Sequence, residues 1–405
     1  MQIGIVPLFS PVHDPLRLER QIPWLREIEQ SGGFTFEWST PDQSTEADLK
    51  VYFLRTGGTE QEFRTLYRQT ADPIYLLVYP GENSLAASLE ILAYVRRMGG
   101  RGEIIQGTPQ AIATRLTMLA RSAGALRHLS QSRLGIIGRP SDWLIAGNAD
   151  PDAVYMRWGT ELVDVPLAEM SALVRPVQRH EGWLTEVSQA ATSCAAHAPE
   201  SLDWAQGMYT ALQTIRQRYR LNALTLRCFD LLDEFHQTGC LPLARLNDEG
   251  IPAGCEGDVP ALFSMVLSFY LTGRAAFMSN PASVNLEKNQ MVLAHCTVPT
   301  SLVTSFSLPT HFESGLGLGI RGKLPLGRCV ILRVGGPALD QYWLSGGEII
   351  ENLERNDLCR SQILVQVDED LGTMLTNPLG NHRIVVPGDD VVLFQTFFDR
   401  AGCLR

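Results

Sequence analysis

The chain has 405 residues, of which 45% are hydrophobic and 19% charged, and its formal net charge at pH 7 is −10. This length predicts two or three domains with sizeable cores. The negative charge argues against binding to nucleic acid or to an anionic membrane surface.

Cysteine usage and hydropathy indicate a cytoplasmic protein. The eight cysteines are scattered and form no CxxC pair, so neither a zinc knuckle nor a thioredoxin-like motif is expected. The N-terminus shows no signal-peptide pattern. The longest apolar run, residues 259–270, is too short to span a membrane and predicts a buried helix.

The first half of the chain alternates strand-like and helix-like segments. An apolar strand over residues 3–8 precedes a helical pattern over 14–30. Further strands are expected in 34–38, 49–58, 73–81 and 102–107, with a helix over 84–100, and the pattern restarts in 133–147, 153–166 and 222–232. Continuous apolar strands between helices predict parallel sheets covered on both faces, here in two doubly wound α/β domains.

After about residue 300 the helical periodicity fades. Short strand-like runs, punctuated by Gly and Pro, occupy 302–309, 328–336, 362–368 and 382–397. They predict an antiparallel, small barrel-like β domain at the C-terminus. The expected domains are therefore residues 1–130, 131–298 and 299–405, the second carrying Glu256 and the third His382.

Two carboxylates lie at the start of the apolar segment 259–270. Asp258 is expected to cap this helix, and because Pro260 has no N–H, the capped group must be that of Ala261. Capping accounts for Asp258 but not for Glu256. Glu256 is either a second charge at the helix N-terminus or a functional carboxylate.

Three histidines follow in the sequence. His295 comes after an apolar strand-like run, and His311 and His382 lie at turns. Each is open to a purely structural role. A glutamate with two histidines beside strands also suits a divalent metal ion.

Several motifs resemble the superfamily of L-fucose isomerase and L-arabinose isomerase. The segments are "AGCEGDVPALFSMVLSFYLTGRAAFMSN", "NLEKNQMVLAHC", "RTGGTE", "GENSLAASLEILAY", "GRPSDWLIAG" and "GNHRIVVPGD". Together they reach from near the N-terminus to residue 389, in the superfamily's order of two α/β domains and a β-rich domain.

The resemblance implies an intramolecular oxidoreductase that interconverts aldoses and ketoses with a divalent cation, usually Mn²⁺. It implies that Glu256 ligates the metal and exchanges the substrate proton, and that His382 and His295 are further ligands. It also implies a homo-oligomer, a trimer or hexamer. It further implies that residues in the matching N-terminal loops bind the substrate, namely Gly58, Thr59, Glu60, Asn83 and Ser84.

One departure concerns the second acid of the superfamily. Its expected place reads Ser279-Asn280-Pro281, which contains no carboxylate. Asn280 can offer a carbonyl oxygen to a metal but cannot act as a general base. Asp230, near the carboxyl end of the strand-like run 223–229, is a candidate substitute, and capping of the next helix is its alternative role.

The sequence therefore predicts a sugar isomerase-like enzyme that acts through a metal-stabilised enediolate. The alternatives are a sugar-binding or regulatory relative without catalysis, and an epimerase that uses the same enediolate. The partner in each case is a small-molecule sugar, which the sequence does not name.

Overall fold

The computed structural model describes residues 2–12, 14–40, 47–70, 72–175 and 183–405. The chain divides into two compact units, Met1–Gly124 and Ala125–Arg405, which are described separately below. Within the described residues, every helix is too short or too polar to cross a membrane.

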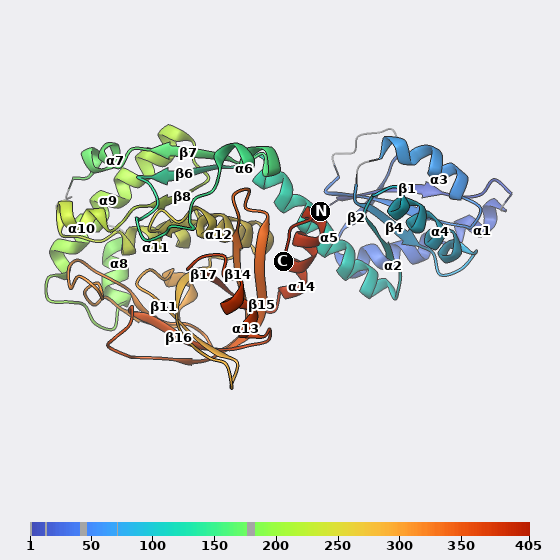
Figure 1. Cartoon of the computed structure of the whole chain (residues 1–405). Helices are drawn as coiled ribbons and strands as arrows, with labels where there is room; N and C mark the ends of the chain where they lie inside the picture. The colour runs from blue at the N-terminus through green and yellow to red at the C-terminus, as the bar shows by residue number, and fades with distance from the viewer. Residues whose placement is uncertain (1, 13, 41–46, 71, 176–182) are drawn as a thin grey trace. The chain divides into compact units, whose positions relative to one another are not determined.

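The first unit is a five-stranded parallel sheet in the order β2-β1-β3-β4-β5 (Figure 1). Its strands are β1 (Gln2–Leu8), β2 (Thr35–Trp38), β3 (Leu49–Leu54), β4 (Ile74–Val78) and β5 (Gly102–Ile105). Its helices are α1 (Pro15–Glu19), α2 (Ile22–Gly32), α3 (Glu60–Leu66), the short 3-10 helix η1 (Tyr67–Gln69), α4 (Ser84–Arg97) and the start of α5 (Pro109–Leu129).

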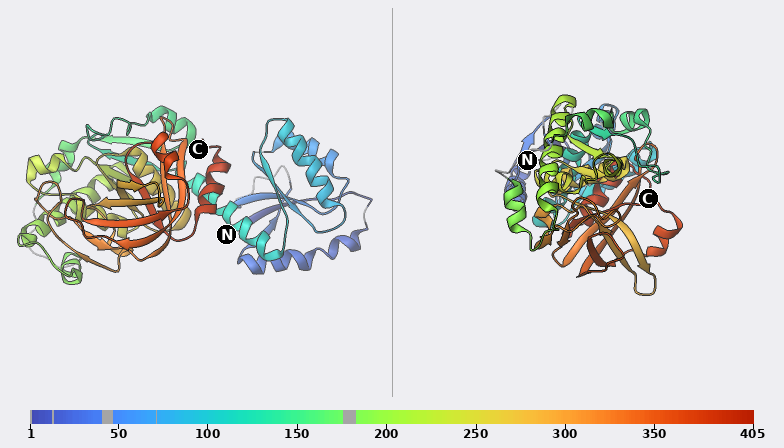
Figure 2. Two further views of the ribbon diagram at one scale, coloured as in Figure 1. Left: turned by 60° about the horizontal axis from the view of Figure 1, so that its bottom comes forward. Right: turned by 90° about the vertical axis from the view of Figure 1, so that its left-hand side faces the viewer.

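Helices cover both faces of this sheet (Figure 2). Leu25 and Ile28 of α2 pack with Leu116 of α5 against one face. Phe63 of α3 and Ile91 of α4 pack against the other. The parallel sheet with two buried faces is the arrangement expected from the apolar strands.

The expected single helix over residues 14–30 is two helices. Asp14 caps α1 by accepting from the backbone N–H of Leu16, and α1 ends at Glu19. Pro23 lies near the start of α2. A proline ring clashes with the carbonyl four residues earlier, which here is that of Glu19, so the first helix cannot continue through Pro23.

The second unit begins with a four-stranded parallel sheet in the order β7-β6-β8-β9. Its strands are β6 (Arg133–Ile137), β7 (Glu161–Val165), β8 (Ala223–Leu226) and β9 (Ala253–Cys255). Its helices are α6 (Pro151–Trp158), α7 (Leu167–Leu173), α8 (Trp183–Ala190), α9 (Ala198–Tyr219), α10 (Asp230–Phe235), α11 (Cys240–Asp248) and α12 (Val259–Thr272).

A closed antiparallel barrel of six strands follows, in the order β10-β11-β16-β15-β14-β17. Its strands are β10 (Phe277–Asn285), β11 (Gln290–His295), β14 (Gly327–Gly335), β15 (Gln341–Asn352), β16 (Ser361–Val367) and β17 (Arg383–Pro387). The remaining elements are η2 (Thr300–Leu302), β12 (Ser305–Ser307), β13 (Arg321–Lys323), α13 (Leu371–Thr376) and α14 (Val391–Ala401). Two parallel α/β sheets followed by a small barrel confirm the predicted fold class.

The barrel starts earlier in the chain than the expected β-rich domain. β10 and β11 lie within the residues assigned to the second α/β domain, 131–298. The division into three domains at residues 130 and 298 stays a prediction.

The strand-like interpretation of residues 382–397 is correct only for its first half. β17 ends at Pro387, and "VVLFQTF" begins helix α14. Leu393, Phe394, Phe397 and Phe398 are buried, which is the i, i+1, i+4, i+5 spacing of one helix face. A short apolar run does not distinguish a strand from a buried helix, and the helical spacing decides here.

Helix α12 joins the parallel sheet to the barrel within the second unit. It contacts β8 and β9 on the sheet side and β14 and β17 on the barrel side (Figure 1). Almost all its residues are buried, as the apolar run 259–270 predicts. The N-terminus of α12 therefore lies where sheet and barrel meet. Glu256 and Asp258, which directly precede the helix, lie at the same place.

Candidate active site and metal centre

The loop between β9 and α12 holds Glu256 in an unusual backbone conformation. Glu256 has φ 63° and Gly257 has φ 68°, both in the left-handed region. A Cβ at position 257 would lie 2.5 Å from the carbonyl oxygen of Arg139, so glycine is required there. A left-handed glutamate costs conformational energy and is typical of a functional position.

The backbone and side chain of Glu256 are both anchored. Its carbonyl oxygen accepts from the backbone N–H of Ser141 at 2.9 Å. Its carboxylate Oε2 accepts from the indole Nε1 of Trp143 at 2.8 Å. These contacts aim the other oxygen, Oε1, at two histidines from the barrel.

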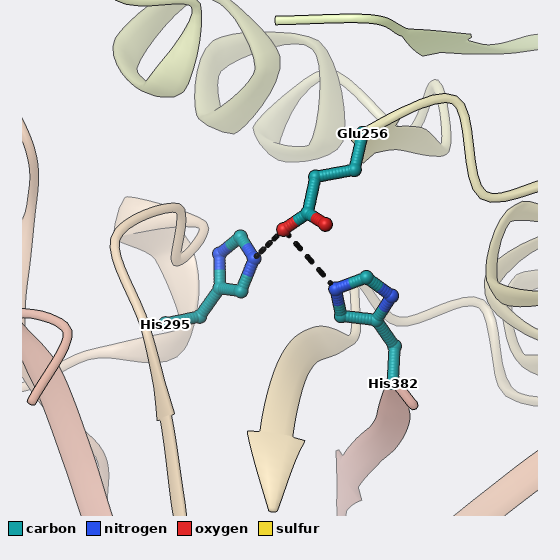
Figure 3. A group of neighbouring side chains, drawn as sticks. All are labelled: Glu256, His295 and His382. Carbon is teal, nitrogen blue, oxygen red and sulfur yellow. Dashed lines mark hydrogen bonds and ion pairs between the residues drawn. The ribbon is translucent and has the colours of Figure 1, made fainter. Parts of the chain in front are cut away.

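Those histidines complete a buried cluster, shown in Figure 3. Nε2 of His382, which precedes β17, lies 3.3 Å from Glu256 Oε1. Nε2 of His295, at the end of β11, lies 3.8 Å from the same oxygen. One ligand atom from each of the three residues lies within 4.8 Å of the others, so the group could hold a metal ion.

Asp258 lies directly behind this cluster. As predicted, it caps α12 by accepting from the backbone N–H of Ala261 at 2.8 Å. Its other oxygen, Oδ2, accepts from Nδ1 of His382 at 2.7 Å and from Nη1 of Arg333 at 2.9 Å. The expectation that capping fully accounts for Asp258 is therefore wrong, because the same fully buried carboxylate also orients His382.

The charged groups of the cluster shift one another's pKa values strongly. Burial raises the pKa of the Glu256 carboxyl, but His295 and His382 outweigh burial and hold that pKa well below its usual range. Burial lowers the pKa of His382, but Asp258 and Glu256 outweigh it and raise this pKa to about 9. Without an ion, the group is an imidazolium beside a carboxylate, and a cation would take the place of the Nε2 proton.

The carboxylate and the two imidazoles suit a divalent cation, but the two histidine rings differ in the hydrogen bond that Nδ1 makes. His382 donates through Nδ1 to Asp258, which leaves Nε2 as the ligand atom, an arrangement typical of metal-binding histidines. His295 instead accepts at Nδ1 from the backbone N–H of Thr297, at 3.1 Å. The neutral ring of His295 then carries its proton on Nε2, which must be lost before that atom can ligate.

Glu256 also lines an open cleft of about 390 Å³. The other lining residues are Trp143, Phe229, Asn280, Glu313 and Asn381. A smaller cavity of about 30 Å³ adjoins Glu256, Asn280, Glu313 and His295 and is also lined by five cysteines and His311. The cleft thus offers aromatic faces, two amides and two carboxylates to a polar ligand of modest size.

Asn280 stands where the second acid of the superfamily is expected, and Asp230 is the candidate substitute for that acid. The two residues occupy different surroundings. Asn280 lines the cleft, and its Oδ1 accepts from Nδ2 of Asn381 at 2.7 Å. Asp230 is the first residue of α10, and both its oxygens accept from Nε of Arg227, at 2.8 and 2.9 Å. Neither cavity around Glu256 includes Asp230 among its lining residues.

The structure adds residues that sequence reasoning missed. Trp143, Phe229, Glu313 and Asn381 line the cleft, and Arg333 pairs with Asp258. Trp143 lies in the quoted segment "GRPSDWLIAG", Asn381 lies in "GNHRIVVPGD" beside His382, and Glu313 lies two residues after His311. Neighbouring positions in those motifs were the available signal.

In the first unit, the residues expected to bind substrate lie at the carboxyl ends of β3 and β4. The backbone N–H of Gly57 donates to the carbonyl of Glu82 at 2.7 Å, which joins the loop of Gly58, Thr59 and Glu60 to that of Asn83 and Ser84. This edge of a sheet ordered 2-1-3-4-5 is where open α/β folds bind ligands. Their role in substrate binding stays a prediction.

Two curated proteins show similarity to the chain. It is 26% identical over 233 residues to a sulfoquinovose isomerase of Alkalicoccus urumqiensis, covering 56% of this chain and 52% of that protein. It is 24% identical over 264 residues to a sulfoquinovose isomerase of Clostridium sp. (strain MSTE9), covering 62% and 59%. The chain thus spans a little over half the length of these relatives, and no family model matches it.

Proposed function

We propose that the chain is a sugar isomerase that interconverts an aldose and a ketose through an enediolate. The observation that carries the proposal is the buried group of Glu256, His295 and His382 beside an open cleft. The names of the two similar proteins support the same class of reaction. The L-fucose isomerase superfamily remains the proposed wider family.

The chain's own residues would position a sugar and manage protons. Trp143 and the two imidazoles fix the Glu256 carboxylate at the cleft. The amides of Asn280 and Asn381 can exchange hydrogen bonds with sugar hydroxyls, and the rings of Trp143 and Phe229, 4.8 Å apart, can contact its C–H face. Glu256 is a proposed catalytic carboxylate of this site and also a proposed metal ligand.

The proposed cofactor is a divalent metal, Mn²⁺ by resemblance, held by Glu256 and His382, with His295 and the Asn280 carbonyl oxygen as further ligands. Such a cation would stabilise negative charge that develops on the sugar oxygens. An imidazole, carboxylate and amide oxygen together suit Mn²⁺ better than Ca²⁺.

An isotope-exchange assay tests the function. The protein is incubated in D₂O with Mn²⁺ and a panel of aldoses that includes sulfoquinovose, and NMR follows deuterium at C1 and C2. We expect deuterium incorporation together with a ketose product. Deuterium at C2 with inversion and no ketose would identify an epimerase instead. A panel without any exchange would favour a sugar-binding relative and contradict the proposal.

A homo-oligomer, a trimer or hexamer, belongs to the same proposal and rests on the superfamily resemblance. Light scattering at micromolar concentration measures it directly. A mass near 44.8 kDa, that of one chain, would contradict it.

A further inference from the structure

The loop after β12 brings a second carboxylate to the cleft. Glu313 lines the open cleft and the smaller cavity, and Glu256 lines both as well. Its backbone is fixed by hydrogen bonds on either side: the N–H of His311 donates to the carbonyl of Leu316, and that of Gly315 to the carbonyl of His311, both at 3.0 Å. A braced turn therefore presents Glu313 at the place where a substrate would lie.

The two glutamates of the cleft differ in their hydrogen-bond and ion-pair partners. Glu256 Oε1 faces His382 and His295, and Oε2 accepts from Trp143. Glu313 makes no hydrogen bond or ion pair with any residue in the part of the chain that the structure describes. Its oxygens are therefore available to a ligand in the cleft.

The surroundings of Glu313 favour its protonated form. Burial raises the pKa of the Glu313 carboxyl, and the nearby Glu256 charge raises it further, although His295 opposes this. A carboxyl group that takes up a proton more readily is better suited to move one at a substrate carbon.

We propose that Glu313 is the catalytic carboxylate that moves the proton between C2 and C1 of the substrate, in place of the acid that the sequence lacks at Asn280. This inference rests on the proposed isomerase function.

In the aldose-to-ketose direction, the Glu313 carboxylate takes the proton of C2–H, and that bond's electron pair forms the C1=C2 double bond. The electron pair of the C1=O1 π bond moves to O1, which gains a proton. Loss of the O2 proton then forms C2=O2, and the C1=C2 pair takes a proton from the exposed Glu313, in part replaced by deuterium in D₂O, as a new C1–H bond. The proton lost from O2 balances the one gained by O1, so no oxidant or reductant is needed.

The two other candidates for this role are less suitable. Asn280 carries an amide and cannot accept the proton. Asp230 shares both its oxygens with Arg227 and lies outside both cavities. Glu313 is the remaining carboxylate that shares the cleft with Glu256 among the residues described.

The test compares Glu313→Gln and Glu313→Asp with wild type, using the aldose that wild type turns over. We expect kcat to fall at least about 100-fold in Glu313→Gln, with a KM within about threefold, and to recover in part in Glu313→Asp. Deuterium exchange from D₂O into the sugar should fall in parallel. Unchanged Mn²⁺ affinity and thermal melting would show that the fold and the metal site are intact.

Glu351→Gln is the matched control, because Glu351 is an exposed glutamate of β15 and should leave kcat unchanged. Exchange in wild type and equally in Glu313→Gln would overturn the role of Glu313 and leave the isomerase function standing. Loss of exchange in Asp230→Asn but not in Glu313→Gln would assign the role to Asp230. Absence of exchange in wild type with every sugar would remove both the function and this inference.

Discussion

His382 donates its Nδ1 proton to Oδ2 of Asp258 across 2.7 Å, in an environment where both side chains are fully buried. The same carboxylate pairs with Arg333 and caps helix α12. The Asp258 side chain thus contacts the start of helix α12, the Arg333 side chain of β14 and the candidate metal ligand His382. Removing it disturbs stability and site geometry together.

We predict that Asp258→Ala destabilises the protein by roughly 3–5 kcal/mol, the cost of leaving a buried charge unpaired. Loss of a helix cap alone costs about 1 kcal/mol, so the Arg333 and His382 contacts account for the excess. Urea denaturation monitored by circular dichroism measures the difference.

Asp150→Ala provides the control for that measurement. Asp150 caps α6 by accepting from Asp152 and Ala153, and it is exposed. It should cost about 1 kcal/mol, as an ordinary cap does. Equal losses for Asp150→Ala and Asp258→Ala would mean that the buried ion pair contributes nothing beyond capping.

The two histidines of the cluster should contribute unequally to metal binding. Nδ1 of His382 donates to Asp258 and can keep its proton when Nε2 binds a cation, whereas Nδ1 of His295 accepts from Thr297, so the neutral ring of His295 has its proton on Nε2. We expect His382→Ala to weaken Mn²⁺ binding at least about tenfold more than His295→Ala does. Calorimetric titration of both variants decides this, and a larger loss in His295→Ala would contradict the assigned tautomers.

Glu256→Gln should abolish turnover and keep the fold. The amide preserves volume and can still accept from Trp143, but it cannot take a proton and is a poorer metal ligand. A fall in kcat of at least about 100-fold is expected. The far-UV circular dichroism spectrum should match that of wild type, while the melting temperature should fall relative to the neutral reference Glu351→Gln because the ion pair with His382 is lost. Activity within about threefold of wild type would exclude Glu256 from the chemistry.

His311 should make stability depend on pH below neutrality. Burial is the main cause that lowers the pKa of His311 from 6.5 to about 4, and the neighbouring His295 and Arg360 lower it further. The fold therefore favours the neutral ring. The stability that this preference contributes is complete above pH 6.5 and is lost as the pH falls toward 4.

Comparison with His311→Gln isolates this contribution. Between pH 7 and pH 5, wild type should lose about 2 kcal/mol more stability than the variant, by linkage between protonation and folding. Chemical denaturation at several pH values gives both curves. Parallel curves for the two proteins would show that His311 is not held neutral in the fold.

Local chemistry accounts for the parts of the site that the sequence predicts. The cap at Ala261 follows from Asp258 and Pro260, and the buried helix follows from the apolar run behind them. Glu256 stands out in the sequence because helix capping leaves it without a role. These inferences need only neighbouring residues and backbone rules.

The remaining site residues meet only in the folded chain. Trp143 and Glu256 are separated by 113 residues, and Arg333 and Asp258 by 75. No periodicity relates such positions, because sheet order and barrel closure decide which strand ends meet. Likewise, the apolar run of α14 resembles a strand in the sequence, but six other segments close the barrel and this run is helical.

Asn280→Asp should tighten divalent metal binding. Asn280 lies on β10 and lines the cleft with Glu256, where the superfamily resemblance places the second acid. The side chains are nearly isosteric, and an aspartate oxygen can still accept from Asn381, so the fold should tolerate the change. An added negative charge beside a divalent cation supports a gain of about tenfold in affinity, near 1.4 kcal/mol. Catalysis need not improve, because Glu313 is the proposed proton carrier. Calorimetric titration of Mn²⁺ into both proteins gives the answer, and an unchanged or weaker affinity would show that Asn280 does not face the metal.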